Sequence, residues 1–135
     1  MSSAWADGPM QPPPKVVVQE CSSCHIAYWP NFLPTSSWKQ VLSQLDKHYG
    51  TDASLPDDAL RAVSDAILSQ SQEAGEAPPN NRFTRSFWFT RKHGPRHVSP
   101  DVWQRASVKS PTNCTACHLQ AEQGNFDEHA IRIPR

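Results

Sequence analysis

Apolar side chains recur at helical spacing in residues 35–50, TSSWKQVLSQLDKHYG. The recurring positions lie three or four residues apart and predict one amphipathic helix with a single buried face. They are Trp38, Val41, Leu42, Leu45 and Tyr49. Ser36 or Ser37 can cap the start of this helix, and Gly50 can close its end. His48 lies three residues after Leu45, so we expect it to share the buried face.

Ser54 can cap a second predicted helix, which runs out by Gly75. Leu60, Val63 and Ile67 mark its inner stripe. Two aspartates follow the proline at its start, where the positive end of the helix dipole favours negative charge.

Shorter elements are predicted around these two helices. The β-branched run Val16-Val17-Val18 leads into residues 20–26, which open a brief helix. Residues 83–93 predict another short helix, although their alternating aromatic side chains could equally start a strand. One helical turn is expected in residues 100–103, and a helix capped by asparagine in residues 113–124. The chain is therefore predicted to be mainly α, with long irregular loops and little or no sheet.

Proline-rich segments and charge divide the chain into three parts. Residues 1–14 end in QPPP and predict a disordered or extended arm, and residues 76–82, EAPPNNR, are typical of a linker. Residues 1–80 hold four Lys/Arg against nine Asp/Glu, a net charge of −5, whereas residues 81–135 hold nine against four, a net charge of +5. We therefore predict a first lobe in residues 15–80 and a second lobe in residues 81–135, packed as one compact unit. The charge difference can steer a charged protein partner, or the basic residues can neutralise acidic cofactor groups.

The motif C-x-x-C-H occurs twice and uses all four cysteines of the chain. Each pair of thiols can bond to the two vinyl groups of one porphyrin, and the following histidine can ligate its iron from the proximal side. Positions i, i+3 and i+4 share one face of a helical turn, so the geometry suits this use. We predict two covalently bound c-type haems, in a small two-lobed helical protein. The residues concerned are Cys21, Cys24 and His25 in the first copy, and Cys114, Cys117 and His118 in the second.

Two other uses of paired cysteines fit less well. A thioredoxin-like redox site has one C-x-x-C pair within a βαβ pattern, and no such pattern surrounds either copy. Two pairs could form a four-thiolate zinc site, but the gap between them is far longer than in a zinc ribbon, and both histidines stay unexplained.

The sixth iron ligand decides what such a haem does, because two histidines give a low potential and an empty position admits small ligands. The two methionines both precede the first motif, so methionine ligation is not expected. His48 and His93 each close a predicted helix with a glycine nearby, and we assign them as distal ligands of the first and second haem by proximity in the chain. The crossed pairing stays open. His97 and His129 are predicted to be more exposed.

Longer segments around these residues carry a family resemblance. They are CSSCHIAYWPNFLPTSSW, LDKHYG, FWFTRKHG, SPTNCTACHLQAEQGNFDE and the closing IRIP. On these segments the chain resembles the small dihaem cytochrome c family, often abbreviated DHC. The resemblance implies a mainly α-helical periplasmic protein with two bis-histidine haems, His25 and His118 being the proximal ligands and His48 and His93 the distal ones. The segment RHVSPDVW departs from the family pattern and adds His97 as a competing ligand.

We therefore expect an electron-transfer protein, not an enzyme, that passes electrons between redox partner proteins through two low-potential haems. The alternative is a haem enzyme, or a gas-binding or sensing protein, with one open or labile sixth position. The resemblance implies a membrane b-type cytochrome or a small oxygen-binding monohaem cytochrome as partners. No dense basic run points to nucleic acid, and no apolar stretch is long enough to span a membrane.

The location of the protein is predicted from its first residues and its chemistry. Ala4-Trp5-Ala6 resembles the small-x-small site at which signal peptides are cleaved. Covalent haem attachment is typical of the bacterial periplasm. We expect an exported, periplasmic protein whose signal peptide has been removed.

Overall fold

The computed structural model describes residues 10–135 of the chain. The proposed cleavage site at residues 4–6, and residues 1–9 of the predicted arm, lie outside this range. The chain divides by its internal contacts into two compact units. We call Pro13–Arg91 the front unit, and Lys92–Arg135 together with residues 10–12 the rear unit. The predicted lobes concern which segments surround which haem, and their boundary stays a prediction.

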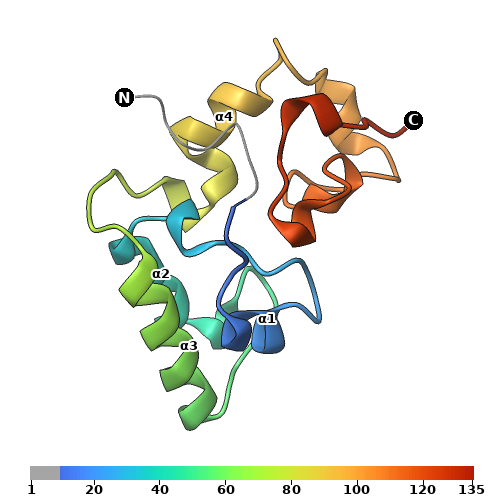
Figure 1. The fold of residues 1–135 in the computed structure, drawn as a ribbon. Coiled ribbons are helices and arrows are strands. Elements are labelled where there is room, and N and C mark those ends of the chain that lie inside the picture. Colours follow the sequence, from blue (N-terminus) through green and yellow to red (C-terminus); the bar gives the residue numbers. More distant parts are fainter. Residues whose placement is uncertain (1–9) are drawn as a thin grey trace. The chain divides into compact units, whose positions relative to one another are not determined.

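Four α-helices form within residues 10–135, joined by short 3-10 turns and irregular segments (Figure 1). They are α1 (Lys15–Cys21), α2 (Thr35–Ser43), α3 (Asp57–Gln70) and α4 (Phe87–His93). In place of a sheet, this part of the chain has three isolated β-bridges. The predicted mainly α fold is therefore confirmed.

The core of the front unit forms where α3 contacts α1 and α2. Val63 and Ile67 on the inner stripe of α3 are almost fully buried, as predicted. Trp38 of α2 is also buried, and its indole N–H donates a hydrogen bond of 2.7 Å to the carbonyl of Pro30. This bond satisfies the one polar group of the indole, so the ring is buried without an unpaired donor.

The helix predicted for residues 35–50 is shorter than expected, because α2 ends at Ser43. Gln44 leaves the helical conformation (φ −131°, ψ 36°), and a 3-10 turn follows at Leu45–Lys47. The predicted extension to Gly50 is therefore wrong, and His48 lies in the loop beyond the helix. The Ala53 N–H donates a hydrogen bond of 2.7 Å to the Leu45 carbonyl, which folds this loop back on itself.

The start of α3 also differs from the prediction, since it begins at Asp57. Ser54 does not cap it. Its hydroxyl instead donates a hydrogen bond of 2.5 Å to the carboxylate of Asp52, a local competition that serine and aspartate side chains often win over helix extension.

The secondary structure predicted around the two C-x-x-C-H motifs is wrong in detail. The run Val16-Val17-Val18 belongs to α1, and the first motif closes that helix instead of opening one. Val17 is buried in the front unit, so its burial overrides the β preference of valine. The predicted helix in residues 113–124 is replaced by two 3-10 turns, Cys114–Ala116 and Ala121–Gln123.

The predicted end at Gly124 is correct, for a reason that lies elsewhere in the chain. Gly124 has φ +79°, and a β-carbon there would lie 2.4 Å from the carbonyl oxygen of Met10. The Met10 N–H also donates a hydrogen bond of 2.9 Å to the Gly124 carbonyl. Only glycine accepts both the left-handed conformation and this close approach.

Two of the shorter elements match their predictions. Residues 83–93 form a 3-10 turn, Phe83–Arg85, followed by α4, so the alternative strand is not formed. The single turn expected in residues 100–103 is a 3-10 helix, Pro100–Gln104.

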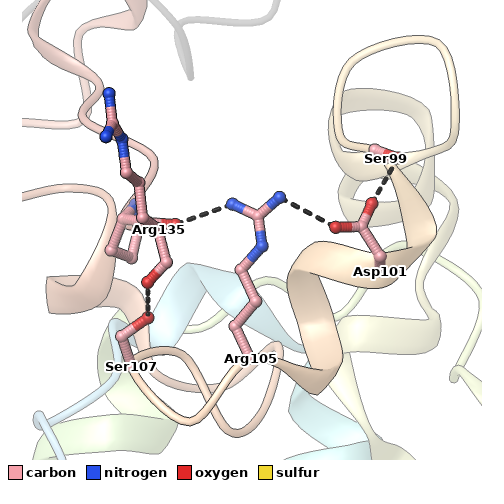
Figure 2. A network of polar contacts seen from close by, with 6 residues as sticks. Ser99, Asp101, Arg105, Ser107 and Arg135 are labelled. Atoms are coloured by element: carbon pink, nitrogen blue, oxygen red, sulfur yellow. Dashed lines mark hydrogen bonds and ion pairs between the residues drawn. The ribbon is translucent and has the colours of Figure 1, made fainter.

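A polar network fastens the C-terminal residues of the rear unit (Figure 2). Arg105 donates hydrogen bonds to the carboxylate of Asp101 at 2.8 Å and to the carbonyl of Pro134 at 2.7 Å. The Ser107 hydroxyl donates to the backbone oxygen of Arg135 at 2.9 Å. The side-chain hydrogen bonds from Ser99 and Arg105 hold the pKa of the Asp101 carboxyl below its usual value. These bonds join the last two residues of the chain to residues 101–107.

Candidate functional site

The first motif begins at the C-terminal end of α1, where Cys21 is the last helical residue. Cys24 lies in the turn that follows, and His25 directly after it. His48 approaches from the loop after α2, and the centres of the His25 and His48 rings lie 6.2 Å apart with an angle of 27° between their planes. Two histidines that are 23 positions apart in the chain therefore face each other within the front unit.

The second motif forms an equivalent pair within the rear unit. His93 is the last residue of α4, and His118 follows the 3-10 turn that begins at Cys114. Their ring centres are also 6.2 Å apart, with an angle of 68° between the planes. The two pairs thus share one spacing and differ in the relative rotation of the rings.

The spacing of both pairs suits one metal ion between two imidazoles. Bonds between a metal and an imidazole nitrogen are about 2 Å long, so two rings on opposite sides of one ion have centres about 6 Å apart. If the imidazoles simply packed against each other, there would be no reason for both pairs to have the same distance between ring centres. The donor set therefore fits an iron held by two histidines at each motif, as a haem with two axial imidazoles requires.

Backbone contacts from the C-terminal segment hold the second motif in place. The Arg132 N–H donates a hydrogen bond of 2.9 Å to the Cys117 carbonyl, and His118 forms an isolated antiparallel bridge with Ile131. The His118 N–H donates a further bond of 2.8 Å to the Cys114 carbonyl. These bonds give the histidine a defined backbone position even though the motif is not in an α-helix.

The four cysteines are free thiols, available for bonding to a porphyrin. Cys24 is exposed, and the other three are half-buried. Burial raises the pKa of Cys114 to about 11 and raises the pKa of Cys117 and Cys21, with the Glu20 charge adding to the effect at Cys21. Raised values do not suit a redox-active thiolate pair, which needs a lowered pKa.

Burial acts on the histidines in the sense that iron ligation requires. It lowers the pKa of His48 and of His118, and the neighbouring histidine of each pair lowers it further. The neutral imidazole, which is the form that binds a metal, is therefore favoured at these two positions.

Aromatic side chains contact both histidine pairs. Tyr28 stacks on His25 with ring centres 4.6 Å apart and an angle of 13°. Phe126 meets the edge of His118 at 5.1 Å, and Trp103 lies 6.2 Å from His93. Tyr28 could have been found from its position three residues after His25, whereas the partners of His93 and His118 have no local signal.

The other two histidines lie outside these pairs. His97 is exposed in the turn after α4, where its N–H donates to the Gly94 carbonyl at 2.9 Å. His129 is exposed too, and its imidazole contacts the Asp127 carboxylate at 2.9 Å. Both placements agree with the expected exposure.

Residues 10–135 were also compared with what a zinc site and a membrane-spanning helix would require. No three of their His, Cys, Asp and Glu side chains come together as ligands of a metal ion, as a zinc site would require. None of the helices in this range is long and apolar enough to cross a membrane.

Comparisons with known proteins agree with the geometry. The family model of dihaem cytochrome c, DHC, matches residues 17–126. A crystal structure of DHC purified from Rhodobacter sphaeroides is 34% identical, with 82% of this chain and 95% of that chain covered and a TM-score of 0.72. Another dihaem cytochrome c structure from Rhodobacter sphaeroides is 32% identical, with 82% and 94% covered and a TM-score of 0.73. The dihaem cytochrome c from Shewanella baltica OS155 is 28% identical, with 92% and 95% covered and a TM-score of 0.77. A search of curated protein sequences found no match.

Proposed function

Because the chain belongs to the dihaem cytochrome c family, we propose that His25 with His48, and His93 with His118, are the axial pairs of its two c-type haems. The observation that carries this proposal is the ring-centre separation of 6.2 Å in both pairs. Cys21 and Cys24 then bond covalently to the first haem, and Cys114 and Cys117 to the second. The uncrossed pairing is supported because each distal histidine faces the motif of its own unit.

The proposed activity is electron transfer at low potential between redox partner proteins. A c-type haem exchanges one electron between ferric and ferrous iron, and two histidine ligands keep its potential lower than a histidine and a methionine would. The protein contributes ligation, covalent attachment and an aromatic environment on both sides of each site. Two firm axial ligands leave no position for a substrate, which favours an electron carrier over an enzyme.

We propose that this activity takes place in the periplasm. The family resemblance supports export to the periplasm and exchange with a membrane b-type cytochrome or an oxygen-binding monohaem cytochrome. The net charge of −5 in residues 1–80 and +5 in residues 81–135 would orient a charged partner as it approaches.

The optical spectrum of the dithionite-reduced protein, before and after carbon monoxide, tests the axial ligation. We expect no change on mixing, because both irons hold a strong sixth ligand that carbon monoxide can replace only slowly, after the histidine dissociates. A shift of one haem would mean an open or labile position and would favour the alternative, a gas-binding protein or haem enzyme. A shift of both haems would contradict bis-histidine ligation altogether.

Replacing His93 by alanine should open the second haem. We expect His93→Ala to retain both haems but to make one iron high-spin and able to bind carbon monoxide, because alanine offers no sixth ligand. The matched control is His97→Ala, which removes an exposed histidine four residues further on and should leave both irons low-spin. If the two variants behaved in the opposite way, His97 would be the distal ligand of this haem.

A further inference from the structure

His48 lies at the start of a strained tight turn. The His48 N–H donates a hydrogen bond of 2.8 Å to the Thr51 carbonyl, and the Thr51 N–H returns one of 3.0 Å. Between them, Tyr49 has φ +50° and Gly50 has φ +89°. Glycine adopts this conformation freely, but tyrosine does so only when its surroundings hold it there. The contacts of Tyr49 should therefore explain why this turn exists.

Tyr49 is held by a segment that is remote in the sequence. Its hydroxyl donates to the carbonyls of Asn80 at 3.2 Å and Asn81 at 3.0 Å. The guanidinium carbon of Arg82 lies over its ring, 4.5 Å from the centre, within the range of a cation–π interaction. The hydroxyl and the ring face of Tyr49 are thus both held by residues 80–82.

The same tyrosine touches the proposed ligand. The Tyr49 and His48 rings meet edge to face with centres 5.0 Å apart and an angle of 72°. Tyr49 therefore connects residues 80–82 to the imidazole of His48, and it restrains both the backbone and the ring of that histidine.

Residues 80–82 are themselves anchored. The Asn81 side-chain amide donates a hydrogen bond of 2.7 Å to the Gln40 side chain on α2, and the Asn81 N–H donates to the Pro78 carbonyl at 2.9 Å. A polar pocket lies here, lined by residues of the α2 end, the His48 turn and residues 80–82. Its charged lining groups, Lys47 and Arg82, are both basic.

From these contacts we propose that Tyr49 and Arg82 are positioning residues that keep His48 on the iron of the first haem. They act on the iron ligand through the turn at residues 48–51. The inference rests on the proposed role of His48 as distal ligand. We call the contacts of Tyr49 with residues 80–82 the clamp. Weakening the clamp should let the turn relax and should raise the fraction of time that the sixth position of the iron is open.

The test measures how fast carbon monoxide binds to the reduced holoprotein. For Tyr49→Phe, which keeps the ring and removes the hydroxyl, we expect binding at the first haem about three- to tenfold faster than in the wild type. For Arg82→Gln we expect the rate of carbon monoxide binding to rise about two- to fivefold. For Arg82→Lys the rise should be smaller, because lysine keeps the cation over the ring. The double variant, Tyr49→Phe with Arg82→Gln, should bind carbon monoxide about six- to fiftyfold faster, the product of the two single effects.

Controls separate positioning from general loosening. Arg85→Gln removes an exposed arginine three residues from Arg82 and should not alter the rate. The thermal unfolding midpoint of each variant should stay close to that of the wild type, because Tyr49 is 41% exposed. The spectrum of His48→Ala with carbon monoxide identifies the first haem.

The two proposals fail in different ways. Suppose that His48→Ala binds carbon monoxide but the double variant binds it no faster than the wild type, or that neither the double variant nor the wild type binds it. The positioning role of Tyr49 and Arg82 is then wrong, and the assignment of His48 as a ligand stands. If acceleration occurs only together with a large fall in the unfolding midpoint, the clamp is also wrong. If His48→Ala leaves both haems closed, His48 is not a ligand and the proposed axial pair falls.

Discussion

A His48→Ala variant should retain both covalent haems and show one high-spin, carbon monoxide-binding iron in an otherwise low-spin protein. In the proposed assignment, attachment of the first haem depends on Cys21 and Cys24, which the substitution does not change. Removal of the imidazole leaves His25 as the sole axial residue of the pair whose ring centres lie 6.2 Å apart. Optical and electron paramagnetic resonance spectra of the oxidised protein would detect the high-spin iron, and difference spectra with carbon monoxide would detect the open position.

His129→Ala is the matched control for this variant. His129 is exposed and contacts Asp127, so its loss should leave both irons low-spin. An unchanged low-spin spectrum in His48→Ala would remove His48 from the ligand set. A variant in which both irons became high-spin would instead indicate that the two sites depend on each other.

The chemistry of this chain is easier to predict from the sequence than its local structure. The two C-x-x-C-H motifs depend on spacing alone, because the porphyrin requires two thiols and a histidine close together. His48 and His93 could be proposed because each follows a helical pattern and few other ligands exist. The family match and the solved structures then support two c-type haems in a helical protein.

The backbone around the motifs could not be predicted, because distant contacts decide it. The β-branched run of residues 16–18 is helical because Val17 is buried in the front unit. Helix α2 ends at Ser43 although the predicted apolar stripe continues to Tyr49. The second motif is held by Arg132 and Ile131, which follow it by more than ten residues. Local propensity carries no information about such partners.

The clamp on His48 illustrates the same limit. The sequence marks Tyr49 as one more apolar position in a helical stripe, whereas the structure places it in a turn with φ +50°. Its partners at residues 80–82 lie in a segment that composition marks only as a linker. A residue that serves a neighbouring ligand through a long-range contact has no local pattern by which it could be found.

The rear unit has few buried apolar side chains, so we expect the second haem to stabilise its fold. Within the described residues of this unit, three apolar side chains are buried, namely Val102, Val108 and Ala121. The front unit buries several large aromatic residues, among them Trp29, Phe32 and Phe83. Small units with little buried apolar surface depend on cofactors or cross-links for stability. The covalent bonds of the second haem should therefore support the fold of residues 92–135.

Cys114→Ser should weaken or abolish the attachment of one haem and leave the other intact. The serine hydroxyl cannot form the thioether, so only Cys117 remains to bond to the second haem. We expect mass spectrometry of the denatured protein to show chains that have lost one haem. Where the second haem is retained through Cys117 alone, its reduced absorption band should shift to longer wavelength, because one vinyl group is left unreacted. Hydrogen exchange in residues 92–135 should become faster as the cofactor is lost. Cys21→Ser is the matched variant and should affect the other haem only. Two fully attached haems in Cys114→Ser would contradict the covalent assignment at the second motif.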